Sequence, residues 1–258
     1  MTIEDADTGA AAGPEAPAKG SRSTRSHIPV WQETLILLVV AVLLAVVLKA
    51  LFVQAFYIPS ESMEPGLVKN DRILVQKVSY WGGGSPDRGD VVVFEDPGGW
   101  LGPAETADTG NVLTRGLEKI GLYPSGGHLV KRVIGIAGDT ITCCDDQGRL
   151  SVNGVPVDES SYVKDDGTLA CAGPMTGNCS WSTGPVPEGH VFVMGDNRAH
   201  SADSTVHMCL EGQTECPPGR EFVSTDLIVG KVFALVWPLS HFGGVGGNGA
   251  FDQVPDAG

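Results

Sequence analysis

The 258 residues of this chain suffice for one or two domains with a sizeable core. Its 35 glycines and 17 prolines favour a β-rich body with many turns. Only 17 basic residues stand against 31 acidic ones, for a formal net charge of −14. Without a basic stripe to neutralise phosphates, we expect no nucleic-acid partner.

The N-terminal region holds a polar segment followed by a membrane-length apolar run. Residues 1–30 are rich in Ala, Gly, Pro and Ser and are predicted to be disordered. Thr34–Val53 carries one charge, Lys49, and is about as long as a helix that crosses a bilayer, so we assign residues 31–55 as a transmembrane anchor. Basic residues precede the run and the next after Lys49 is Lys69, which predicts a cytoplasmic tail and an extracytoplasmic body.

A cleaved signal peptide is the alternative for this run, because Val53-Gln54-Ala55 fits a small-x-small cleavage pattern. The apolar core of a signal peptide is about 7–15 residues long, and this run is longer. We therefore favour an uncleaved anchor in the cell membrane.

The body that follows reads as a series of strands separated by turns. Strands are predicted over Asp71–Val78, Val91–Phe94, His128–Asp139, Leu150–Val152, Val155–Val157, His190–Met194 and Ile228–Trp237. Asn153-Gly154 is a two-residue hairpin signal. Arg88-Gly89-Asp90 resembles an adhesion motif, but it leads directly into a strand and is not expected on a free loop.

These elements predict a mainly β fold: one N-terminal transmembrane helix, then an antiparallel catalytic domain over 56–240 with a smaller inserted β section. Residues 95–127 lack periodicity and are predicted to be an insertion, with a short helix at Leu117–Leu122. Residues 140–190 form an inserted cysteine-bearing section. A flexible tail is expected over 241–258.

The six cysteines all follow residue 140, which indicates an oxidising compartment. Cys171 with Cys179 and Cys209 with Cys216 enclose short loops and are candidate disulfides among 15 possible pairings. Adjacent cysteines such as Cys143 and Cys144 rarely bridge one another. No C-x-x-C or H-E-x-x-H spacing occurs, so we expect no metal and no cofactor.

A candidate nucleophile lies in the stretch Ser60–Leu67, soon after the anchor. Ser60 and Ser62 are held between Pro59 and Pro65, whose rings restrict the backbone. On its own, such a stretch is more often a plain turn. A serine also needs a base, and no His-Asp pair is recognisable near Ser62.

Lys131 is the candidate base, because it stands among apolar residues in the predicted strand His128–Asp139. Burial disfavours the charged form of lysine and can lower its pKa by several units from about 10.4. The structural alternative is an edge-strand charge that blocks aggregation.

Several blocks in a fixed order resemble one family, the type I (bacterial leader) signal peptidases, in its actinobacterial form. They are the apolar run, Phe56–Leu67, Arg88–Phe94, Val130–Gly135, Gly195–Arg198 with Ser201-x-Asp203-Ser204, and Ile228–Lys231 with Trp237-Pro238. The resemblance covers about residues 31–238. It implies a membrane-anchored serine endopeptidase built on coiled β-sheets.

The resemblance also implies roles for individual residues. Ser62 matches the nucleophile, and Lys131 matches the general base that later protonates the leaving amine. The Ser62 backbone N–H and the Ser60 hydroxyl match the oxyanion donors. Ser201 matches the serine that orients the lysine amine. Asp203 matches a carboxylate that pairs with arginine, and Arg132 is the available partner.

Two positions depart from the family pattern. Thr205 stands where arginine is usual, and Gly66 stands where threonine is usual. The first departure leaves Arg132 as the expected partner of Asp203. Neither position belongs to the proton-transfer groups.

The substrates implied are signal peptides of preproteins that emerge from the translocation machinery beside the membrane lipid. By resemblance, shallow apolar pockets accept small side chains at positions −1 and −3, which gives an Ala-x-Ala preference. The pocket residues implied are Phe56, Ile58, Met63, Leu67 and Val130. We expect the protein to be a monomer.

The sequence is also compatible with two other functions. One is a membrane-anchored extracellular binding module whose disulfide loops form the contact surface. The other is an inactive relative that kept the fold, with Thr205 as a sign of drift.

Overall fold

The computed structural model describes residues 29–102, 127–164, 180–209, 216–247 and 249–256. The chain divides into two compact units, Met1–Leu43 and Leu44–Gly258. Residues 1–28 of the segment 1–30 predicted to be disordered lie outside the described residues, and α1 begins at Val30. The predicted helix Leu117–Leu122 and the candidate pair Cys171 and Cys179 also lie outside them.

Helix α1 (Val30–Phe52) contains the apolar run. Its Val30–Leu48 part has a mean hydropathy of 2.4 and is long and apolar enough to cross a bilayer, and none of that part is buried. The helix ends at Phe52 and strand β1 (Val53–Tyr57) begins at the next residue, so the predicted anchor over 31–55 extends too far. Along β1, Gln54 and Phe56 are buried and their neighbours are more exposed, which is the alternation of a strand with one face on the body.

The main sheet has eight strands, and all its pairings are antiparallel. Its order is β1-β2-β11-β3-β4-β9-β10, with β12 paired to β11. The further bounds are β2 (Arg72–Gln76), β3 (Val91–Glu95), β4 (His128–Gly135), β9 (His190–Met194), β10 (Val223–Ser224), β11 (Ile228–Trp237) and β12 (Gly243–Gly244). The mainly β, antiparallel prediction is confirmed.

The centre of this sheet is buried on both faces. Val91 and Val93 of β3 pack in one apolar cluster with Val130, while Val92 and Phe94 pack in another with Leu129. A strand covered on both sides reads as a continuous apolar run. The neighbouring strand β4 is buried along most of its length, and this burial includes its two basic residues.

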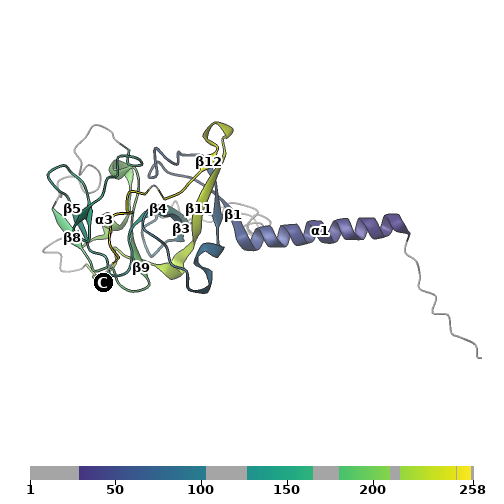
Figure 1. The fold of residues 1–258 in the computed structure, drawn as a ribbon, viewed down its shortest axis with the longest axis horizontal. Coiled ribbons are helices and arrows are strands. Elements are labelled where there is room, and N and C mark those ends of the chain that lie inside the picture. Colours follow the sequence, from purple (N-terminus) through teal and green to yellow (C-terminus); the bar gives the residue numbers. More distant parts are fainter. Residues whose placement is uncertain (1–28, 103–126, 165–179, 210–215, 248, 257–258) are drawn as a thin grey trace, which may run out of the picture. The chain divides into compact units, whose positions relative to one another are not determined.

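A second sheet of four strands forms the inserted section, in the order β7-β6-β5-β8. Its strands are β5 (Ile141–Cys143), β6 (Ser151–Val152), β7 (Val155–Pro156) and β8 (Trp181–Thr183). The predicted hairpin is present: Asn153 and Gly154 have φ of 51° and 76°, as a two-residue turn of type I′ requires. In Figure 1, β5 and β8 lie at one side of the body and β1 and β11 at the other.

Short helical turns connect the strands. They are η1 (Val78–Gly83), η2 (Arg198–His200), α3 (Ser204–His207), η3 (Thr225–Leu227) and η4 (Leu239–His241).

Two disulfides involve described cysteines. Cys209 and Cys216 are joined, as one of the candidate pairings proposed, with their Cα atoms 5.6 Å apart. Cys143 and Cys144 are also joined, contrary to the expectation for adjacent cysteines. They lie at the end of β5, where the side chain of Cys143 is buried in the core of the small sheet.

The prediction of a flexible tail over 241–258 is wrong for its described part. Phe251 and Val254 are only 7% and 8% exposed and pack in the core of the small sheet. The carbonyl groups of Val254 and Pro255 accept hydrogen bonds from Arg88. Burial of Phe251 and Val254 and the hydrogen bonds from Arg88 hold this segment in place, although its sequence is rich in glycine.

The Arg88-Gly89-Asp90 turn is built into the fold, as expected. Arg88 forms a bidentate ion pair with the buried Asp139, with both N···O distances 2.7 Å. Asp90 is 3% exposed and pairs with Lys231 at 2.5 Å. These contacts leave the motif unsuited to adhesion.

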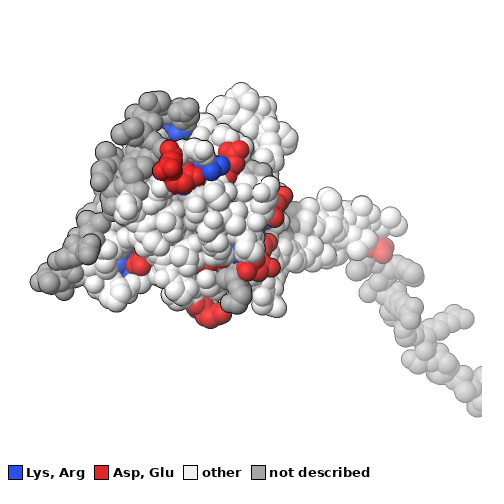
Figure 2. Space-filling model, turned by 60° about the vertical axis from the view of Figure 1, so that its left-hand side comes forward, with Lys and Arg blue, Asp and Glu red and all other residues white. Residues whose placement is uncertain are grey.

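The face of the molecule in Figure 2 shows groups of acidic side chains and few basic ones, in line with the acidic composition. This sign of charge favours cationic over anionic partners on that face.

Candidate active site

The side chains of Ser62 and Lys131 meet in the structure. Lys131 Nζ lies 2.6 Å from Ser62 Oγ, although 69 residues separate them in the chain. Ser62 stands in the turn after β1, and Lys131 stands in the middle of β4 opposite Val92 of β3. An unprotonated amine at this position can accept the hydroxyl proton and make the serine a nucleophile.

Both side chains are removed from water, since Lys131 is 4% exposed and Ser62 is 5% exposed. By strand alternation, Lys131 shares a face of β4 with Leu129 and Val133, and both of those residues belong to an apolar cluster. Burial of this kind disfavours a charged amine. The edge-strand alternative for Lys131 is wrong, because β4 lies between β3 and β9.

The turn that carries Ser62 is fixed from two sides. The side chains of Met63 and Leu67 are buried, and the Leu67 N–H donates to the Met63 carbonyl. On the other side, the backbone N–H of Asn197 donates to the Ser62 carbonyl at 3.0 Å, and its side-chain amide donates to the Glu61 carbonyl. The nucleophile is therefore held by its backbone as well as by Lys131.

The hydroxyl group of Ser60 lies 3.2 Å from that of Ser62. Ser60 is exposed at the mouth of the site, so its hydroxyl can turn towards a bound group. This position suits a donor to an oxyanion that forms next to Ser62.

A cavity of about 200 Å³ opens beside the two catalytic candidates. It is lined by Ile58, Pro59, Ser60, Ser62, Met63, Trp100, Leu101, His128, Leu129, Val130, Lys131, His200 and Ala202. Of the five predicted pocket residues, Ile58, Met63 and Val130 line it. Phe56 and Leu67 are each 2% exposed and lie in the apolar cluster behind the cavity.

Residues 31–237 match the model of the family described as signal peptidase, peptidase S26. The chain belongs to this peptidase family.

Several relatives in the family have signal peptidase names. "Signal peptidase I" of Mycobacterium tuberculosis is 38% identical over 254 residues, which cover 90% of this chain and 83% of that protein. "Probable signal peptidase I" of Mycobacterium leprae is 35% identical over 95% of this chain and 88% of that protein. The crystal structure of a signal peptidase I from Enterococcus faecalis is 22% identical, covers 57% of this chain and 96% of that one, and has a TM-score of 0.32.

The predicted ion pair between Arg132 and Asp203 is wrong. Arg132 does not take Asp203 as its partner in the structure; it forms a bidentate ion pair with Asp196, with N···O distances of 2.8 and 2.7 Å. Both side chains are buried. Their positions explain the choice, because Arg132 and Met194 are opposed in the β4–β9 pairing and Asp196 follows two residues later.

Asp203 has a different set of partners. It accepts hydrogen bonds from the Ser201 hydroxyl at 2.5 Å and from the Gly195 N–H at 2.9 Å. The N–H and hydroxyl of Thr205 donate to its other oxygen at 3.0 and 2.7 Å. The threonine that replaces the usual arginine thus still contacts the carboxylate, which also caps α3.

The cavity also has a side that the sequence analysis missed. Trp100, Leu101, His128 and His200 line it, and the ring of Trp100 stacks on that of His207 at 4.3 Å. His128 could have been found, because strand alternation places it on the same face as Val130. Trp100 could not, because it lies in the aperiodic stretch after β3.

Proposed function

We propose that this protein is a membrane-anchored serine endopeptidase that removes N-terminal signal peptides from exported preproteins at small-x-small sites. The observation that supports this most strongly is the 2.6 Å approach of Lys131 Nζ to Ser62 Oγ in a buried setting. The names of the relatives in the family point to the same activity.

In the proposed reaction, Ser62 Oγ attacks the carbonyl carbon of the scissile peptide bond while its proton passes to Lys131 Nζ. The tetrahedral intermediate then collapses: the C–N bond breaks, and Lys131 returns the proton to the departing amine. The signal peptide is now an ester of Ser62. Lys131 then takes a proton from water as the oxygen attacks the ester carbon. This second intermediate collapses, the C–O bond to Ser62 breaks, and Lys131 returns the proton to Ser62 Oγ.

Negative charge develops on the carbonyl oxygen during both attacks. The Ser62 N–H and the Ser60 hydroxyl are the proposed donors to this oxygen. The Ser62 N–H is held by the turn and needs little reorganisation when the charge forms, whereas the exposed Ser60 hydroxyl rotates towards the oxygen.

The cavity supports a preference for small side chains. Ile58, Met63 and Val130 bring apolar surface to its wall close to Ser62. Shallow pockets with such walls would exclude bulky groups by steric clash, which discriminates more strongly than an added methylene does.

We also propose that α1 anchors the protein with its N-terminus in the cytoplasm and the sheets outside. The apolar length of the helix and the basic residues before it support this orientation. A nucleophile close to the end of this helix meets substrates that are themselves held in the bilayer as they leave the translocation machinery, so their local concentration is high.

Incubation of the full-length protein in lipid vesicles with a preprotein tests the proposal. We expect the parent to release the mature protein, and Ser62→Ala and Lys131→Ala to reduce cleavage to the background rate. Lys69→Ala is the matched control, because Lys69 is an exposed lysine near the same turn. A parent that does not cleave would refute the peptidase, and cleavage that survives Lys131→Ala would refute the role of the lysine.

A further inference from the structure

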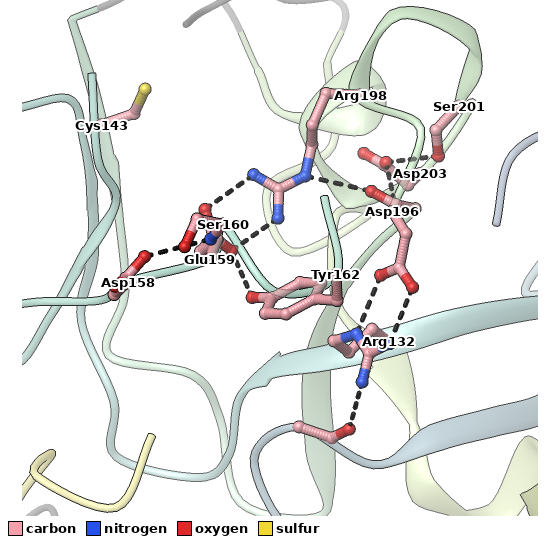
Figure 3. Close-up of polar contacts among 12 residues, drawn as sticks. Arg132, Cys143, Asp158, Glu159, Ser160, Tyr162, Asp196, Arg198, Ser201 and Asp203 are labelled. Atoms are coloured by element: carbon pink, nitrogen blue, oxygen red, sulfur yellow. Dashed lines mark hydrogen bonds and ion pairs between the residues drawn. The ribbon is translucent and has the colours of Figure 1, made fainter. Parts of the chain in front are cut away.

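One segment of the inserted section, which includes Glu159 and Tyr162, is joined by polar contacts to Arg132 and Arg198 (Figure 3). Arg198 donates two hydrogen bonds to the carboxylate of Glu159, at 2.9 and 2.6 Å. Both side chains are 11% exposed. The hydroxyl of Tyr162 donates to the same carboxylate at 2.5 Å. A buried bidentate pair of this kind fixes orientation as well as distance.

The same segment supports a second ion pair. The guanidinium carbon of Arg132 lies 4.3 Å from the centre of the Tyr162 ring. Arg132 also holds Asp196 by two hydrogen bonds and donates to the Gly89 carbonyl at 2.8 Å. Tyr162 thus contacts both ion pairs, with its hydroxyl at one and its ring at the other.

These ion pairs hold the loop formed by residues 195–198. Arg198 Nε donates to the Gly195 carbonyl at 3.0 Å, and the Lys164 N–H donates to the Asp196 carbonyl at 3.0 Å. The next residue, Asn197, donates to the Ser62 carbonyl. Loop 195–198 is therefore tied to the inserted section on one side and to the nucleophile on the other.

The network reaches both members of the catalytic pair. Ser62 is connected to it through Asn197, and Lys131 is the chain neighbour of Arg132. Neither Glu159 nor Tyr162 lines the cavity described above. Their influence on the reaction must pass through these contacts.

We propose that Glu159 and Tyr162 are positioning residues that hold Ser62 and Lys131 in register through loop 195–198 and Arg132. This inference rests on the proposed peptidase function. It assigns a role in catalysis to the inserted section, whose four-stranded sheet otherwise stands apart from the chemistry.

The protonation states fit this arrangement. Burial raises the pKa of the Tyr162 hydroxyl, and the charge of Glu159 raises it further, so the hydroxyl remains a donor. Burial lowers the pKa of Arg198, but attraction by Glu159 outweighs this effect and the net shift is upward. Arg198 therefore stays charged across the pH range in which proteins are assayed.

The test compares Glu159→Gln and Tyr162→Phe with the parent, each as the full-length protein in lipid vesicles. Glu159→Gln keeps the shape and removes the charge, while Tyr162→Phe keeps the ring under Arg132 and removes the hydroxyl bond to Glu159. We expect kcat to fall about 10-fold or more for Glu159→Gln, because small displacements of reacting groups are costly. KM should stay within about twofold of the parental value. The assays are run at temperatures where unfolding curves show the parent and the variants folded.

Asp145→Asn is the matched control. Asp145 forms an ion pair with Arg149 at 2.8 Å in the same inserted section, but both side chains are partly exposed and neither lines the cavity. We expect its kcat to equal that of the parent. In the double variant Glu159→Gln/Arg198→Gln, the loss should be smaller than the product of the two single losses, because the residues act as one unit.

A second readout separates this inference from the proposed function. The ε-carbon of ¹³C-labelled Lys131 can be titrated by NMR in each protein, whether or not it cleaves a preprotein. A titration midpoint that moves in Glu159→Gln and not in Asp145→Asn supports the positioning role. An unchanged midpoint, or a kcat loss fully accounted for by unfolding, would overturn it. A parent that fails to cleave would instead refute the peptidase.

Discussion

A Cβ atom on Gly195 would lie 2.5 Å from the carbonyl oxygen of Ser62. It would also overlap the side chain of Ser201. The loop after β9 and the turn that carries the nucleophile pass so close to each other that only a hydrogen atom fits between them.

Gly195→Ala should therefore remove most of the activity. The methyl group must push the Ser62 turn away from the Asn197 N–H, and overpacking of this kind costs about 1–3 kcal/mol of stability. We expect kcat to fall about 100-fold, since a displacement near 1 Å at the reacting atoms has effects of that size. Cleavage assays at a temperature where the variant is folded measure the loss.

Gly66→Ala is the control for that substitution. A Cβ on Gly66 would have its nearest neighbours at 3.8 Å, which is an ordinary contact distance, so we expect parental activity. Equal effects of the two alanines would show that the close approach of Gly195 to Ser62 has no role in catalysis.

Ser60→Ala should slow the reaction without abolishing it. Loss of one oxyanion donor costs about 10²–10³ in rate, while the Ser62 N–H remains in place. The expected change is in kcat, with KM nearly constant, in steady-state assays with a signal-peptide substrate. A parental kcat would remove Ser60 from the oxyanion site.

The rate should be higher at neutral to alkaline pH than in acid. Proton transfer from Ser62 requires Lys131 without its own proton, so acid removes the reactive form of the enzyme. The measurement is kcat/KM against pH for the parent at a fixed temperature. A rate that stays constant down to acidic pH would contradict Lys131 as the base.

Stability should also depend on pH, through His207. Burial lowers the pKa of His207, the charge of Arg220 lowers it further, and the charges of Asp203 and Asp96 oppose the shift. Arg220 lies 3.2 Å from His207 Nδ1, and since arginine can only donate, this nitrogen must be an acceptor and the folded-state ring neutral.

The sign follows from this lowered pKa. The unfolded chain takes up the proton near the usual value of about 6.5 and the folded chain does not, so the free energy of unfolding falls as pH drops below that value. His207→Gln should show a weaker fall between pH 7 and 5 in thermal unfolding experiments. Parallel pH dependences of parent and variant would contradict a neutral His207.

The regular elements could be predicted because local pattern decides them. His190–Met194 and Ile228–Trp237 were predicted with the bounds that the structure has, since apolar runs bounded by turn residues mark strands clearly. Strand β1 was missed because Val53–Tyr57 continues the apolar character of the helix, and only pairing with β2 makes it a strand.

The candidate site could be predicted in part. The motifs that carry Ser62 and Lys131 were enough to select both residues, and the structure places them together. The partner of Arg132 could not be chosen by motif, because Asp196 and Asp203 both stand in the same block and only the register of β9 against β4 decides between them. Trp100 reaches the cavity through a loop whose course depends on four N–H groups that bind Asp96.

The packed C-terminal segment limits how the chain can be shortened. A recombinant form that stops after Pro238 would look natural from sequence, because a glycine-rich stretch follows the last long strand. Such a form would expose the apolar side chains that Phe251 and Val254 now cover, and it would leave the guanidinium of Arg88 without two of its acceptors. We expect that truncated form to aggregate on expression, so purification tags belong beyond residue 256 or at the other end of the chain.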